Sequence, residues 1–135
     1  MTARDEPRFI GLDVARAVHD RQLAEHGGLA GVKDQGLLES AMSRPVNKFG
    51  YGETDPCALA AAYAFGIARN HPFADGNKRT AWVMARLFLK LNHVEIAFDK
   101  ADAIRTMLAL AAGDLSEEAL ADWFRAHLVS GGRGA

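Results

Sequence analysis

Apolar residues recur every three or four positions along most of this 135-residue chain, and short polar stretches with Gly or Pro separate these runs. Such spacing lines one face of an α-helix. The first predicted helix is capped by Asp13 and ended by Gly27, and the second is capped by Asp34 and ended by Pro45. Their predicted core positions are Val14, Ala17 and Val18 in the first helix and Leu37, Leu38, Ala41 and Met42 in the second.

The helical pattern of apolar residues ends at Pro45. Residues 46–52 read V-N-K-F-G-Y-G, an aromatic and Gly-interleaved stretch that predicts a short extended segment rather than a helix. A third helix is predicted next, with Asp55 as its cap and Pro56 at its first position. Its Ala-rich body, with Leu59, Tyr63 and Phe65, indicates burial on most sides, so we expect it to be the central helix.

The third helix must end by about Asn70, because Pro72 disfavours the α conformation at the residue before it. His71 to Asp75 then form a tight loop, and a fourth helix runs from Gly76 or Asn77 to about Leu91. A short extended stretch, V-E-I-A-F, and two helices capped by Asp99 and Ser116 complete the pattern. The sequence therefore predicts an all-α fold of about six helices. It forms a single domain over residues 1–129, with a disordered Gly-rich tail at 130–135.

Composition narrows the choice of function. Sixteen Lys and Arg against 17 Asp and Glu leave a net charge of −1, which offers no broad surface for nucleic acid or anionic lipid. Cys57 is the sole cysteine, and the longest apolar stretch, residues 58–68, is too short to span a membrane. We therefore expect a cytoplasmic protein that binds neither nucleic acid nor a membrane.

The fourth helix opens unusually, with Lys78 and Arg79 in its first turn. A helix N-terminus already carries about half a positive charge, so cations there are unfavourable unless an anion binds. The N–H groups of Gly76, Asn77 and Lys78 lack partners within the helix, and Gly76 would let a ligand approach the backbone closely. This pattern predicts a phosphate or polyphosphate site, and a solvated first turn is the simpler alternative.

His71 and Asp75 flank the same helix start. A His can accept a proton from a hydroxyl near neutral pH, and Mg²⁺ prefers a carboxylate together with substrate phosphates. Each has a plainer interpretation, since a loop His can simply brace the loop and Asp75 stands where an N-cap would stand. Together, a base, a carboxylate and an anion site favour phosphoryl or nucleotidyl transfer.

The segment H-P-F-A-D-G-N-K-R-T, residues 71–80, resembles the signature of the Fic superfamily and of its death-on-curing (Doc) branch. Residues 19–28, 31–45 and 113–123 also resemble Doc proteins, so the likeness covers nearly the whole chain. The resemblance implies the all-α Fic fold, with a flap that docks the target protein as an added strand. It identifies His71 as the catalytic base, Asp75 as the Mg²⁺ ligand and Arg79 as a phosphate clamp.

Further roles follow from the same resemblance. Gly76, Asn77 and Lys78 join Arg79 in binding the phosphates of ATP. The flap is placed at residues 46–52, with Val46, Phe49 and Tyr51 as its contact residues.

Two positions depart from the Fic pattern of AMP-transferases, H-P-F-x-[DE]-G-N-G-R-x-x-R. Its second Gly is Lys78 here, and its second Arg is Trp82. Doc proteins carry the same Lys and resemble kinases that transfer the γ-phosphate of ATP to a threonine of elongation factor Tu. Pro72 and Gly76, in contrast, are closer to the Fic pattern than to the Doc pattern. AMP transfer therefore stays an alternative, and so does a non-catalytic module that binds nucleotide or antitoxin.

The sequence lacks the inhibitory motif [ST]-x-x-x-E-[GN] that restrains many Fic enzymes. Restraint would then come from another protein. The resemblance implies a toxin–antitoxin system, in which a small Phd-like antitoxin wraps the toxin with its C-terminal segment.

Overall fold

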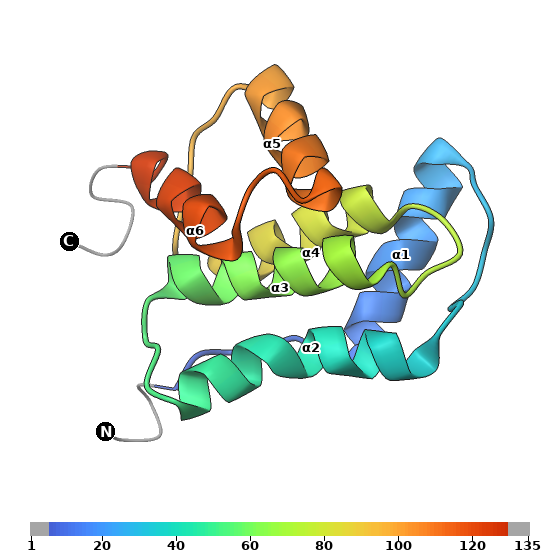
Figure 1. Cartoon of the computed structure of the whole chain (residues 1–135), viewed down its shortest axis with the longest axis horizontal. Helices are drawn as coiled ribbons and strands as arrows, with labels where there is room; N and C mark the ends of the chain where they lie inside the picture. The colour runs from blue at the N-terminus through green and yellow to red at the C-terminus, as the bar shows by residue number, and fades with distance from the viewer. Residues whose placement is uncertain (1–5, 130–135) are drawn as a thin grey trace.

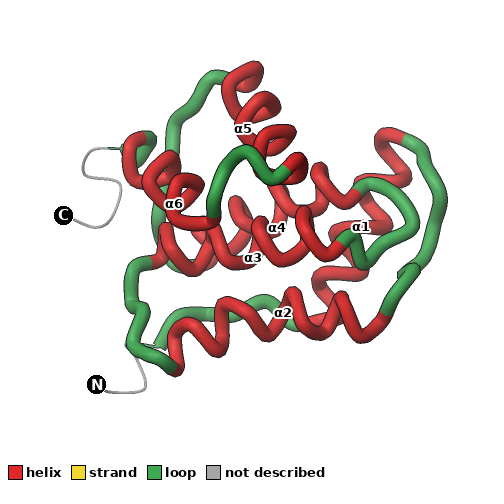
Figure 2. The backbone as a smooth tube through the Cα atoms, in the orientation of Figure 1, coloured by secondary structure: helices red, strands yellow, loops and turns green. Residues whose placement is uncertain are grey.

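The computed structural model describes residues 6–129, and the predicted disordered tail lies outside this range. These residues form six α-helices, as the sequence predicts (Figures 1 and 2). Their bounds are α1 Leu12–His26, α2 Gln35–Gly50, α3 Pro56–Asn70, α4 Asn77–Leu91, α5 Lys100–Ala112 and α6 Glu117–Ala126. The fold is all-α, and within the described range two isolated β-bridges, Val32 with Phe73 and Ile96 with Leu128, are the sole β pairing.

Helix α3 is the central element, as its composition predicts. It packs against α2, α4, α5 and α6, and Figure 1 shows α2 on one side of it and α5 and α6 on the other. Eleven of its 15 residues are buried. Gly66 lets α2 approach closely, because a Cβ at this position would stand 3.0 Å from the Cα of Ala41.

Four predicted caps are confirmed by side-chain hydrogen bonds to amides in the first turn of their helices. The cap residues are Asp34, Asp55, Asp99 and Ser116. The prediction for α1 is wrong in detail, because Gly11 is its N-cap and Asp13 lies inside its first turn.

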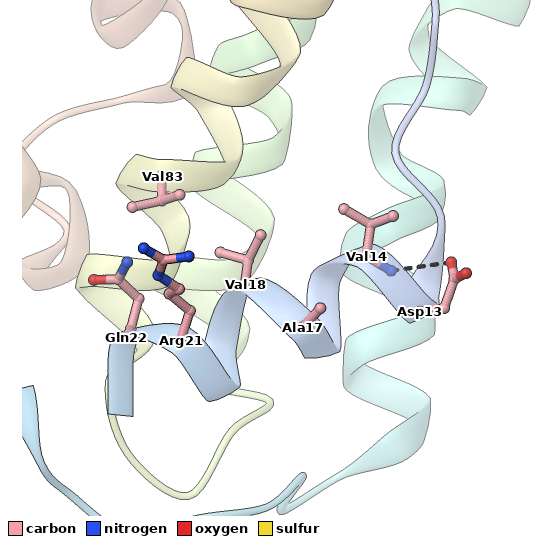
Figure 3. A pocket seen from close by; sticks show the side chains of 7 residues that line it. All are labelled: Asp13, Val14, Ala17, Val18, Arg21, Gln22 and Val83. Carbon is pink, nitrogen blue, oxygen red and sulfur yellow. Dashed lines mark hydrogen bonds between the residues drawn. The ribbon is translucent and has the colours of Figure 1, made fainter. Parts of the chain in front are cut away.

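The predicted core face of α1 is wrong for Val14 and Ala17, which are exposed, whereas Val18 is half-buried and packs against the core. Ala15 and His19 are its buried residues, whereas Val14 is 40% exposed. Figure 3 shows Val14, Ala17 and Val18 beside a shallow hollow of about 390 Å³, with Val83 of α4 at its edge. The buried residues Ala15 and His19 therefore lie beside the predicted apolar stripe and not on it. His19 is polar, so the sequence did not predict it as a core residue.

The predicted extended segment after Pro45 is wrong as well, because α2 continues through Pro45 to Gly50. A Pro inside a helix removes one backbone hydrogen bond and costs about 3 kcal/mol. Tertiary contacts offset this cost. Pro45 is itself buried, Phe49 packs edge to face on Phe9 with ring centroids 5.9 Å apart, and Lys48 forms an ion pair with the buried Glu117.

None of the helices within residues 6–129 has the length and hydropathy that crossing a bilayer requires.

Candidate active site

The candidate site is built on the loop between α3 and α4, which bends sharply at His71. This residue caps α3 in the left-handed conformation, with φ 50° and ψ 55°, and its N–H donates to the carbonyl of Ile67 over 3.2 Å. Histidine tolerates this conformation better than β-branched residues do. The imidazole is exposed and lines a cleft of about 840 Å³, so it is accessible to a substrate.

Asn77 closes the loop from the other side. Its side-chain Oδ1 accepts from the N–H of Phe73 and its Nδ2 donates to the carbonyl of Phe73, both over 3.0 Å. Phe73 is fully buried, so it anchors the loop in the core. The side chain of Asn77 therefore holds the loop in shape, and its backbone N–H remains available at the start of α4.

The loop between α1 and α2 pairs with the same segment. The N–H groups of Lys33 and Asp34 both donate to the carbonyl of Pro72, over 2.8 and 3.1 Å, and the N–H of Ala74 donates to the carbonyl of Gly31 over 3.0 Å. The extended chain that borders the site is thus residues 31–34. It comes from a part of the sequence about 40 positions away from the motif.

Asp75 is held through three of its oxygen atoms. Oδ1 accepts from the N–H of Gly76 over 2.9 Å and Oδ2 from the N–H of Leu29 over 3.3 Å, while the carbonyl accepts from Nε2 of His19 over 2.8 Å. Asp75 does not cap α4 in the ordinary way, because Gly76 is the N-cap and no side chain bonds to the first turn. Each carboxylate oxygen keeps a second lone pair, so Asp75 can still bind a cation.

Gly76 is needed for its backbone conformation. Its φ is 75°, in the left-handed region that favours glycine, and a Cβ there would face His19 and Leu23 at 3.8 Å. Such a Cβ would lie on the side of Gly76 that faces α1.

The cleft is strongly cationic although the chain as a whole is not. The Lys and Arg residues that line it are the four cations Lys33, Lys78, Arg79 and Lys100, and Asp75 is the sole carboxylate in the lining. None of the four cations has an acidic partner within 4.0 Å among residues 6–129. Unpaired cations gathered around one cleft favour an anionic ligand.

Lys33 and Lys100 lie outside the motif, and the sequence analysis did not assign them to the site. Asp102 lies two positions after Lys100 but does not form an ion pair with it. The carboxylate of Asp102 instead lies 3.7 Å from Arg105 and accepts from Nε1 of Trp123 over 3.0 Å. The sequence did contain a signal for Lys100, because it places a cation in the first turn of α5, as Lys78 and Arg79 do in α4, where the helix dipole disfavours positive charge.

Trp82 occupies the part of the cleft wall where α4 and α5 meet. Its ring packs against Phe98, Trp123 and Phe124, with centroids 5.1 to 6.2 Å away. The guanidinium of Arg86 lies over the ring of Phe98 at 4.9 Å. Trp82 is thus part of an aromatic cluster and brings no charge to the cleft.

The structure does not bring the expected flap residues to this site. Val46 and Phe49 lie in the last turns of α2, and Tyr51 follows them. They are at the N-terminal end of α3, whereas His71 is at its C-terminal end, and a 15-residue helix is about 22 Å long (Figure 1). Since residues 46–50 are helical, they cannot dock a target protein as an added strand.

The expected metal site consists of one carboxylate. Residues 6–129 contain no group of three His, Cys, Asp or Glu side chains that could hold an ion by themselves. Asp75 is the acidic residue of the cleft. This donor set suits Mg²⁺, which is commonly bound by one or two carboxylates plus substrate phosphates and water.

Comparison with known proteins identifies the family of this chain. The model of the Fic/DOC family matches residues 9–89. The protein kinase doc of Escherichia phage P1 is 36% identical over 119 residues, which cover 87% of this chain and 94% of that protein. The toxin Doc of Mycolicibacterium smegmatis is 46% identical over 76 residues, 54% of this chain and 58% of that protein. The chain therefore belongs to the Fic/DOC family.

Proposed function

We propose that this protein is a Doc-type toxin that transfers the γ-phosphate of ATP to a threonine of a translation factor similar to elongation factor Tu. The main support for the proposal is that His71 and four unpaired cations line the same cleft. A phosphoryl donor needs the cations, and a hydroxyl acceptor needs the base. The names of the two relatives, a protein kinase and a toxin, support the kinase and toxin parts of this proposal.

The residues divide into three roles. The first amides of α4, with Lys78 and Arg79, hold the phosphate chain of ATP. Asp75 would hold Mg²⁺, and the ion would neutralise charge on the phosphate oxygens. His71 accepts the proton of the threonine hydroxyl as its oxygen bonds to the γ-phosphorus, while the bond from that phosphorus to the bridging oxygen breaks and ADP leaves.

Transfer of AMP is the alternative reaction on this scaffold. It requires space for the phosphate chain where Lys78 stands and a second distal cation where Trp82 stands. Trp82 packs against Phe98 and Phe124 and cannot supply this cation. Its position therefore favours ATP bound in the opposite orientation to that in AMP-transferases, with the γ-phosphate toward the acceptor hydroxyl, and hence the kinase reaction.

A toxin of this kind would act on a cytoplasmic target and would be restrained by a separate Phd-like antitoxin. The extended residues 31–34 border the catalytic loop, so they, rather than residues 46–52, are the place where we expect the acceptor protein to dock.

The test is parallel incubation with α-labelled and γ-labelled ATP, Mg²⁺ and purified elongation factor Tu, followed by the intact mass of the factor. We expect label from the γ-position alone and a mass increase of one phosphate. Label from the α-position with the mass of AMP would establish the alternative. No transfer to this factor or to any protein in a bacterial extract would indicate a non-catalytic module.

A further inference from the structure

His19 is a buried histidine outside the motif. It lies on α1, is 2% exposed, and reaches the catalytic loop through two contacts. Nε2 lies 2.8 Å from the carbonyl oxygen of Asp75, and the ring stacks on Phe73 with centroids 3.9 Å apart and planes 8° apart. Because a carbonyl can only accept, Nε2 carries the hydrogen and donates it.

These contacts act on the two residues that set the shape of the loop. The ring of Phe73 is its anchor in the core, and the carbonyl of Asp75 directly precedes the left-handed turn at Gly76. The donor to this carbonyl fixes the peptide plane between the two residues. That plane orients the carboxylate of Asp75 and the first amides of α4 relative to His71.

We propose that His19 is a positioning residue of the active site, and that its hydrogen bond to Asp75 holds the loop in the geometry that transfer requires. The catalytic part of this inference rests on the proposed function. Its structural part does not, since the conformation of the loop can be measured without any activity. His19 does not line the cleft and so takes no part in the chemical step.

Two substitutions separate the hydrogen bond from the packing. His19→Phe keeps an aromatic ring on Phe73 but has no donor, whereas His19→Gln keeps an N–H donor that can reach the same carbonyl. A matched control is His127→Phe. His127 also stacks on an aromatic ring, that of Trp123 at 4.0 Å, and also has a ring nitrogen, Nδ1, 2.7 Å from a backbone carbonyl, but it does not line the cleft.

Two measurements are made on each variant: kcat and KM for ATP, and amide hydrogen exchange in residues 73–80. For His19→Phe we expect exchange in this segment to rise about tenfold and kcat to fall about 10- to 100-fold, with KM for ATP changed less than threefold. His19→Gln should restore both, and His127→Phe should match the wild type in both.

Wild-type exchange and wild-type kcat in His19→Phe would overturn the proposal, and so would equal losses in His19→Phe and His19→Gln. If the wild-type protein transfers nothing, the proposed function fails, and the exchange measurement still decides whether His19 positions the loop. If His19→Phe does not fold, His19→Asn takes its place, since its amide is too short to reach the carbonyl. Wild-type values in that variant would likewise overturn the proposal.

Discussion

Lys48 and Glu117 form an ion pair that joins the last turns of α2 to the start of α6. Nζ of Lys48 lies 2.9 Å from Oε2 of Glu117, and Nε of Arg44 donates to the other carboxylate oxygen over 2.8 Å. Glu117 is 4% exposed. Arg44 and Lys48 are one helical turn apart, so their shared partner holds the part of α2 that contains Pro45 in a helical conformation.

We therefore expect Glu117→Gln to lower the free energy of unfolding by about 2–3 kcal/mol. Losing one member of a buried ion pair costs about 3–5 kcal/mol, and here Arg44 and Lys48 can regain part of that from water because they are partly exposed. Urea unfolding measures the change. The adjacent Glu118→Gln, at an exposed position, is the control and should change stability by less than about 0.5 kcal/mol.

The second prediction concerns His71. His71→Asn should lower transfer by about 10²- to 10⁴-fold, because an amide cannot act as a base, while stability changes by less than about 0.5 kcal/mol. Asn is chosen because it tolerates the left-handed conformation that His71 adopts. The readouts are γ-phosphate transfer and thermal unfolding. Transfer at the wild-type rate would remove His71 from the mechanism.

The third prediction concerns Lys33. Lys33→Gln should raise KM for ATP about tenfold and weaken its dependence on ionic strength, since a charge-assisted contact is worth about 1.5–3 kcal/mol. The substitution retains the hydrogen bond from the backbone N–H of residue 33 to the carbonyl of Pro72, so the loop should not move. Lys90→Gln, at an exposed position near the end of α4 and outside the cleft, is the matched control. Equal KM values for the two variants would exclude Lys33 from ATP binding.

The fourth prediction concerns pH. Burial raises the pKa of Tyr63 from 10.0 to about 12, and its hydroxyl accepts from the N–H of Ile10 over 2.8 Å. In the unfolded chain the phenol ionises near pH 10, so the stability that this group contributes is complete below pH 10 and is lost between pH 10 and 12. The expected loss from this group by pH 11 is about 1.4 kcal/mol.

Tyr63→Phe provides the comparison for that experiment. It should be less stable than the wild type by about 1 kcal/mol at pH 8, because the N–H of Ile10 loses its acceptor. Its stability should then fall less steeply than that of the wild type between pH 9.5 and 11. Parallel curves for the two proteins would show that folding does not raise the pKa of Tyr63.

The sequence predicted those parts of the structure that local chemistry determines. Asp34, Asp55, Asp99 and Ser116 cap helices because each accepts from an amide in the following turn. The end of α3 at Asn70 follows from the steric effect of Pro72 on its neighbour. The motif residues His71, Asp75, Lys78 and Arg79 were also expected to meet, and they line one cleft.

Features that depend on distant residues could not be predicted in this way. Pro45 predicts a helix end by its own chemistry, and the contacts of Lys48 and Phe49 with α6 and Phe9 override it. Asp102 lies two positions after Lys100, but it contacts Arg105 and Trp123 instead. In each case the deciding partner is remote in sequence or is one of several neighbours that local spacing cannot rank.

The hydrogen bonds between the loop of residues 71–76 and the first third of the chain limit how far the motif can be transplanted. A hairpin of residues 56–91 carries all ten letters of H-P-F-A-D-G-N-K-R-T. It leaves behind the partners of three backbone groups in the loop: the carbonyl of Pro72, the N–H of Ala74 and the carbonyl of Asp75. If the ten residues were grafted onto another helical scaffold, their sequence would be unchanged, but the loop would lose its conformation because these partners are missing. A sequence search that uses this ten-residue motif alone would therefore include proteins that cannot form the site.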